Sequence, residues 1–293
     1  MKKRLGDRKD AKKIRSLNGM FNIMNDLKPR RCEAEVYINQ KIDVTNLIKY
    51  IEKKKKENPE DKITYFHAFS LALAKTIYNR PLLNRFVANR TLYERNDIVL
   101  AFVAKIAFED TSEEIMINIK VDKNENIYDL SRKIKKRVDK VRASKATDKK
   151  ENTNNIVDII GRLPKIFRIP IVGLVKYLDK HGWLPSFITE DNLYYSTAIL
   201  SNLGTLKIGS IYHNITNFGT SSMLATMGEI HKEVVADEKG NMKVVDVCDF
   251  GITCDERIAD GFYFAKSIKL FEYIINNPEL LEGKANEKIE IKE

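Results

Sequence analysis

The sequence contains few of the residues that define several specialised protein classes. Its 293 residues include only three cysteines and one tryptophan. So few cysteines, in an odd number, exclude a disulfide-stabilised secreted scaffold and are typical of the reducing cytosol. No apolar run approaches the roughly 18 residues of a membrane-spanning helix, and no apolar stretch follows the basic N-terminus as it does in a signal peptide. The sequence therefore predicts a soluble, cytoplasmic protein.

Motifs for metal and nucleotide binding are also missing. The cysteines and the four histidines lack the spacing of metal ligands, and no glycine-rich phosphate loop of the Walker or Rossmann type occurs, so no metal site is expected. Positive charge is in excess, with Lys+Arg 51 against Asp+Glu 41. This excess suits a polyanion such as nucleic acid, a phosphate-bearing cofactor or an acidic membrane. Because the basic run 132–150 carries apolar residues at helical spacing, we interpret it as a solvated helix face and expect no nucleic-acid partner.

What the sequence does contain is a regular succession of strand and helix patterns. A hydrophobic share of 43% is ample for a packed core. The predicted strands are 32–42, 97–108, 115–121 and 242–254, and the predicted helices are 63–80 and 260–276. This mixture predicts an α/β domain built on one large, partly antiparallel sheet. No repeat or flexible linker divides the chain, so residues 1–293 are interpreted as a single domain.

One segment, 156–188, has the character of an insertion. It is apolar and basic, is interrupted by prolines and glycines, and holds the single tryptophan, Trp183. We prefer to interpret it as a pair of short helices packed on the domain. A second interpretation is an amphipathic hairpin that lies on a membrane surface or shields a pocket.

A set of short motifs occurs in a fixed order along the chain. A strand over 196–200 runs into Ser201-Asn202-Leu203-Gly204, and a D-E-R-I-A-D-G run spans 255–261 between a strand and a helix. Earlier in the chain come I-D-V-T-N-L at 42–47 and P-L-L-N at 81–84, and N-P-E-L-L follows at 277–281. In this order and spacing, residues 15–282 resemble the catalytic domain of dihydrolipoamide acyltransferases, the acyltransferase component of 2-oxo acid dehydrogenase complexes.

The resemblance implies a fold, an assembly and a substrate. The family has the two-layer α/β sandwich of chloramphenicol acetyltransferase, with a large mixed sheet, and forms trimers whose active sites lie between subunits. Coenzyme A, as acyl-CoA, is the implied substrate, together with an unknown acceptor. From the sequence we expect no lipoyl domain, lipoyl-lysine or peripheral-subunit-binding domain in this chain, and its tail 284–293 is charged. We therefore predict a free-standing homotrimer rather than the core of a multienzyme complex.

The resemblance also implies which residues form the site. In the family motif D-H-R-x-x-D-G the His is the general base, and Glu256 stands at that position. Ser201 matches the serine that donates a hydrogen bond to the oxyanion, although a plain turn residue is an equal alternative. Asp260 matches the carboxylate that orients the loop through an ion pair, and we prefer that role to a chemical one. The supporting motif residues are Asp255, Arg257, Gly261, Asn202 and Gly204.

The exchange of His for Glu256 leaves the function open. An ordinary Glu is less basic than imidazole by about two pKa units, or about 3 kcal/mol in proton transfer, and burial of a Glu would close this gap. The first hypothesis is a CoA-dependent acyltransferase with Glu256 as a retuned base; alternatives are a non-catalytic, trimeric CoA- or acyl-binding scaffold and a different reaction in the same cleft. His67 is interpreted as a core or lining residue, His213 as a conceivable relocated base, and Cys254 as a core-facing strand residue.

Overall fold

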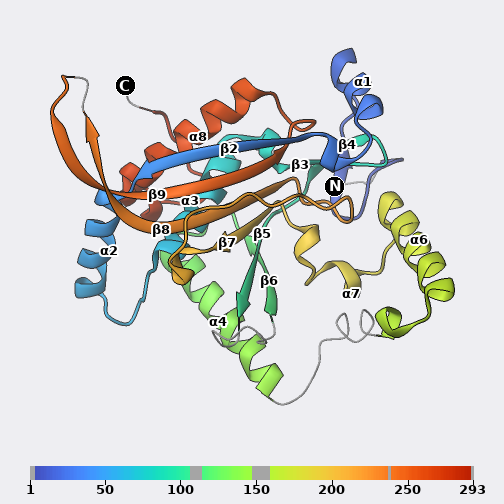
Figure 1. Cartoon of the computed structure of the whole chain (residues 1–293), viewed down its shortest axis with the longest axis horizontal. Coiled ribbons are helices and arrows are strands. Elements are labelled where there is room, and N and C mark those ends of the chain that lie inside the picture. The colour runs from blue at the N-terminus through green and yellow to red at the C-terminus, as the bar shows by residue number, and fades with distance from the viewer. Residues whose placement is uncertain (1–3, 106–113, 147–158, 237–238, 292–293) are drawn as a thin grey trace.

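A six-stranded mixed sheet forms the centre of the computed structural model, which describes residues 4–105, 114–146, 159–236 and 239–291 (Figure 1). The strand order is β2-β9-β8-β7-β5-β6. The bounds of these strands are β2 (Glu35–Asp43), β5 (Ile98–Lys105), β6 (Glu114–Val121), β7 (Ala198–Asn202), β8 (Met223–Ala236) and β9 (Met242–Asp255). The short central strand β7 is parallel to both its neighbours, β5 and β8, and every other pair is antiparallel.

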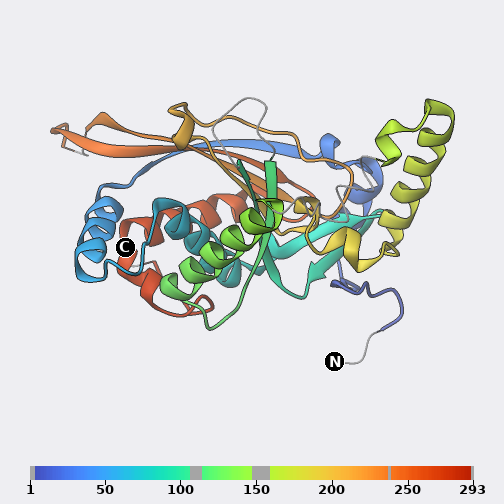
Figure 2. The same cartoon turned by 90° about the horizontal axis from the view of Figure 1, so that it is seen from below.

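Four long helices cover one face of this sheet, as Figure 2 shows. They are α2 (Thr45–Glu57), α3 (Tyr65–Asn79), α4 (Ile127–Ala146) and α8 (Gly261–Asn276). The layers meet in an aromatic contact: the Phe250 ring of β9 lies 5.0 Å from Phe69 of α3 and 5.5 Å from Phe271 of α8, both edge to face. Such pairs add to the stabilisation from apolar burial. The predicted two-layer α/β sandwich with a large mixed sheet is confirmed.

The periodic segments follow their predictions closely. Helix α3 is buried nearly all round and ends just before Pro81, where the proline ring excludes a further helical residue. In α4 the predicted apolar positions Leu130, Ile134 and Val141 face the core, so the basic residues lie on the other side. Strand β9 is one continuous strand over the predicted region 242–254. Residues 106–108 of the predicted strand 97–108 and residues 147–150 of the basic run lie outside the described residues.

A second, smaller sheet was not predicted. It has the order β1-β4-β3 and consists of β1 (Ala11–Lys13), β3 (Arg85–Ala88) and β4 (Thr91–Arg95). The β3–β4 hairpin turns at Asn89 and Arg90, both with positive φ (47° and 59°). Two such residues are typical of a type I′ turn, which usually contains glycine. Because Asn89-Arg90 carries no glycine, the hairpin had no clear signal in the sequence.

The remaining elements are short or peripheral. They are α1 (Gly19–Leu27), α6 (Lys165–His181), α7 (Ser186–Thr189) and the 3-10 turns η1 (Arg31–Glu33), η2 (Pro81–Asn84), η3 (Leu193–Tyr195), η4 (Gly204–Leu206) and η5 (Pro278–Glu282). The preferred interpretation of 156–188, two short packed helices, differs from the structure, in which α6 is a 17-residue helix with only Asp179 buried. Residues 156–158 of that segment lie outside the described residues. None of the helices described is long and apolar enough to cross a membrane.

Candidate active site

The D-E-R turn at the end of β9 is built on a buried ion pair. Asp255, the last residue of β9, is fully buried, and Arg257 is 2% exposed. The guanidinium of Arg257 donates from Nε to Asp255 Oδ1 at 2.8 Å and from Nη2 to Oδ2 at 2.6 Å. Arg31 is a second, more distant cation, with its Nε 3.6 Å from Asp255 Oδ2. Burial lowers the pKa of the Arg31 guanidinium, and the attraction of Asp255 opposes that shift.

Hydrogen bonds hold this turn against the segment before β2 and direct Glu256 outward. Arg257 Nη1 donates to the Lys28 carbonyl at 2.9 Å, and the Glu256 N–H donates to the Ala34 carbonyl at 2.9 Å. The Glu256 carboxylate forms an ion pair with the Lys28 ammonium. The Glu256 side chain remains 32% exposed in the single chain.

Asp260 has a local role at the start of α8. Its carboxylate accepts a hydrogen bond from the Tyr263 N–H at 2.8 Å, so it is the N-cap of the helix. The expected role of Asp260 in an ion pair stays a prediction. Gly261 follows as the first helical residue, and a Cβ there would meet open space. Asp260 therefore positions α8 through its cap.

Ser201 lies apart from this turn, on a groove at the carboxyl end of β7. The groove has a volume of about 670 Å³. Its walls come from α3, α4, β5, β7 and the loop after η4, and they include His67, Arg142 and His213. Within the described part of the chain, no group hydrogen bonds to the Ser201 hydroxyl. This hydroxyl is thus available to donate to a molecule in the groove.

The residues after Ser201 form the tight turn that places it. The Asn202 side chain accepts from the Gly204 N–H at 3.1 Å, which closes the turn. A Cβ at Gly204 would lie 2.9 Å from the backbone oxygen of Gly228 in β8, too close for any side chain. The motif residues Asn202 and Gly204 therefore have structural roles. Asn202 closes the turn, and Gly204 allows the turn to pack against β8.

A family model for the catalytic domain of 2-oxoacid dehydrogenase acyltransferases matches residues 16–170 and 186–282 of this chain. The chain belongs to the 2-oxoacid dehydrogenase acyltransferase family. The unmatched residues 171–185 cover most of α6 and the segment that follows it. A comparison with curated protein sequences found no match.

Solved structures agree with this membership at the level of the fold. A probable dihydrolipoamide acetyltransferase from Listeria monocytogenes is 17% identical with a TM-score of 0.56, over 91% of this chain and 95% of that one. The dihydrolipoamide acetyltransferase of Azotobacter vinelandii is 13% identical with a TM-score of 0.61, over 92% and 93%. A chloramphenicol acetyltransferase is 10% identical with a TM-score of 0.50, over 91% and 98%. The predicted chloramphenicol acetyltransferase-like fold is confirmed.

The sheet register separates the two motifs of this family member within one chain. Ser201 pairs with Thr226 of β8, and Thr226 pairs with Gly251 of β9. Glu256 follows Gly251 by five positions. With about 3.3 Å per residue along a strand and about 4.8 Å between strands, the Ser201 and Glu256 backbones are about 19 Å apart. The two side chains of one chain therefore cannot act on the same substrate atom.

The other candidate residues have separate positions. His213 is exposed and lines the Ser201 groove, whereas His231 lies on β8, outside it. Cys254 is buried in the core as predicted, and burial raises the pKa of its thiol to about 12. Such a thiol is a poor nucleophile. The ion pair between Lys28 and Glu256 was not predicted from the sequence, because the two residues lie 228 positions apart.

His67 lines the Ser201 groove in a neutral state. Its Nδ1 accepts from the Thr64 N–H at 3.3 Å and lies 2.9 Å from Ser131 Oγ. Burial lowers the pKa of this imidazole to about 4. Because the ring in the unfolded chain binds a proton below about pH 6.5, its contribution to stability is present above that pH and is lost as the pH falls toward 4.

We expect the folded protein to lose stability between pH 7 and pH 4, with His67 contributing about 3 kcal/mol of that loss at most. His67→Gln removes the titrating ring. The free energy of unfolding of this variant should therefore fall less steeply than that of the wild type as the pH is lowered from 7 to 4. Urea denaturation of both proteins at several pH values measures the difference. His213→Gln, at an exposed histidine, is the control and should follow the wild type. Equal slopes for His67→Gln and the wild type would contradict the assignment.

Proposed function

We propose that this protein transfers an acyl group from coenzyme A to a thiol, amine or hydroxyl acceptor. Membership of the acyltransferase family supports this reaction class. The observation that carries the proposal is the Ser201 hydroxyl, which faces a groove of about 670 Å³ and has no hydrogen-bond partner among the described residues. Coenzyme A is then a substrate, and the reaction needs no metal.

In the proposed reaction the acceptor attacks the thioester carbonyl and forms a tetrahedral intermediate. The Ser201 hydroxyl donates a hydrogen bond to the oxygen that becomes negative, which stabilises the transition state more than the ground state. A base removes the acceptor proton. Collapse of the intermediate breaks the carbon–sulfur bond, and the CoA thiolate leaves with the electron pair and takes up a proton.

We assign the base to Glu256 of a second copy of the chain, in a homotrimer. A separation of about 19 Å within one chain supports a site made from two copies, because Glu256 and Ser201 are then free to meet across an interface. Glu256 lies on a turn that the buried Asp255–Arg257 pair holds in place. A rigid support of this kind keeps a reacting group in position.

One observation favours a second candidate function, a non-catalytic trimer that binds CoA or an acyl group. The Lys28 ammonium forms an ion pair with the Glu256 carboxylate, so it competes with the proton of a substrate for the same carboxylate oxygen. A partly exposed ion pair of this kind is a common surface contact rather than a catalytic device. Binding without turnover is the property that distinguishes this candidate.

The test is a direct assay of the full chain. We expect release of CoA from at least one acyl-CoA in a panel with thiol, amine and hydroxyl acceptors, followed by chromatography of CoA and acyl-CoA. Because a general base contributes about 10²–10⁴-fold, Glu256→Gln should lower kcat at least about 100-fold and leave CoA affinity by calorimetry unchanged. Glu33→Gln is a matched control, since Glu33 is 31% exposed and also pairs with one cation.

The outcomes separate the two candidates. Tight CoA binding without turnover, with activity created by Glu256→His, supports the non-catalytic trimer. Turnover that Glu256→Gln does not change contradicts the role of Glu256. Absence of both CoA binding and CoA release contradicts both candidates.

A further inference from the structure

Helix α6 lies at one end of the molecule (Figures 1 and 2), and its C-terminal turn is hydrogen-bonded to distant segments of the chain. The Asp179 carboxylate accepts from the Tyr195 hydroxyl at 2.5 Å and from the Gly219 N–H at 2.9 Å. Arg8 Nη1 donates to the Asp179 carbonyl at 3.2 Å. The 17 residues of α6 span about 25 Å. A long helix thus projects from a polar anchor at one end.

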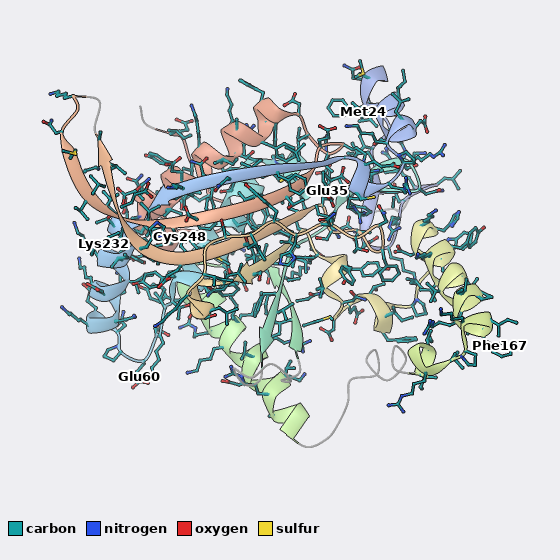
Figure 3. The ribbon with its side chains drawn as sticks, in the orientation of Figure 1. Met24, Glu35, Glu60, Phe167, Lys232 and Cys248 are labelled. Atoms are coloured by element: carbon teal, nitrogen blue, oxygen red, sulfur yellow. The ribbon has the colours of Figure 1, made fainter. Side chains whose placement is uncertain are left out.

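Four large apolar side chains form a continuous line on the outer side of α6, which we name the α6 stripe: Ile166, Phe167, Leu174 and Tyr177. Each is more than half exposed, and Figure 3 shows Phe167 directed away from the sheet. At about 100° per residue, all four fall within an arc of about 100°. Trp183, which is 61% exposed, continues the line, with its ring 6.2 Å from Tyr177 and edge to face.

The charge beside the α6 stripe is of one sign. Lys165, Lys176 and Lys180 are exposed and share one arc next to the stripe. Asp179 is the single acidic residue of α6, and it is buried in the anchor. The outer side of the helix therefore presents cations next to apolar side chains and no anion.

We propose that α6 docks this protein on the surface of a lipid bilayer that contains anionic lipid. The α6 stripe enters the boundary between head groups and acyl chains, and the lysines extend to the head groups. Tyr177 and Trp183 lie at the end of the stripe, and such aromatic rings favour the interface between membrane and water.

The pattern fits a bilayer better than a second copy of this chain. Two α6 helices in contact would bring their lysine arcs together, and like charges at short range oppose such contact. Lysine is also depleted at the centres of protein interfaces. With these charges and Pro170 within it, α6 is suited to lie on the surface, in agreement with the finding that no described helix is able to span a membrane.

Docking of the full chain can be measured by the fluorescence emission of its single tryptophan, Trp183. On addition of phosphatidylcholine vesicles that contain phosphatidylglycerol, we expect a blue shift of tryptophan emission and co-sedimentation of the protein. Vesicles of phosphatidylcholine alone should bind more weakly, and salt should weaken the binding to anionic vesicles. Ser in place of Ile166, Phe167 and Leu174 together should lower vesicle affinity at least about tenfold.

A matched control tests whether any exposed apolar pair acts in the same way. Val234 and Val244 face each other on the β8–β9 hairpin and are 60% and 63% exposed. Val234→Ser with Val244→Ser should leave vesicle binding unchanged. Absence of binding by the wild type, or equal binding by the α6 variant, overturns the proposal. A shift of oligomeric state by the α6 variant in light scattering, without loss of vesicle binding, overturns it in favour of a second copy.

Discussion

Replacing Arg257 with methionine is expected to destabilise the folded protein by about 3–5 kcal/mol. The guanidinium makes two hydrogen bonds to the fully buried Asp255 carboxylate. Methionine fills a similar volume and has no charge, so Asp255 would keep only the more distant Arg31 and the hydrogen bond from the backbone N–H of residue 257 at 3.2 Å. A buried charge that loses its close partner carries its full desolvation cost. Urea or thermal denaturation of the purified variant measures the loss.

Two further variants show whether the pair itself is responsible. Glu256→Gln changes the neighbouring residue and removes only the partly exposed pair with Lys28, so it should cost less than about 1 kcal/mol. The double variant Asp255→Asn with Arg257→Met should cost less than the sum of the single changes, because the two residues are in contact. A loss below about 1 kcal/mol for Arg257→Met would contradict the structural role of the pair.

Mixing two inactive variants is expected to restore activity, which follows from the proposed two-copy site. Glu256→Gln and Ser201→Ala each damage one half of the site. When they assemble at random in a ring of three, about a quarter of the sites receive an intact Glu256 from one copy and an intact Ser201 from the next. Co-expression in equal amounts should therefore give about a quarter of wild-type kcat, and light scattering checks that the assembly is a trimer.

The control is each variant co-expressed with a differently tagged copy of itself. Such trimers contain no intact site and should keep the low activity of the single variant, which for Ser201→Ala is about 10²–10³-fold below wild type. Mixed trimers that stay at this level would show that Glu256 and Ser201 do not act together across an interface. If light scattering also showed that the protein is a monomer, the predicted trimer would be contradicted as well.

The regular parts of the fold were predictable because their patterns are local. Helix α3 and strand β6 follow from the spacing of apolar residues and from the proline after α3. The β3–β4 hairpin was not predictable, because Asn89 and Arg90 adopt positive φ without a glycine to signal it. Helix α6 also differed, because an apolar sequence was interpreted as packed, whereas the structure leaves the α6 stripe exposed.

Parts of the candidate site were predictable in the same sense. The motif order identified Ser201 and the turn that holds Glu256, and their family was then shown independently. The ion pair of Lys28 with Glu256 and the cap formed by Asp260 were not predicted. Lys28 is remote in sequence, and an aspartate before a helix is equally compatible with a cap and with an ion pair.

The sequence by itself determined the family, the two-layer α/β class and the identity of the motif residues, since these depend on residue type and spacing along the chain. Only the tertiary structure decided where those residues lie. The sheet register places the Ser201 and Glu256 backbones about 19 Å apart. Asp255 forms buried ion pairs with Arg257 and Arg31. The fold also leaves α6 projecting with its apolar side outward. These features arise from contacts between segments distant in sequence, which no local pattern records.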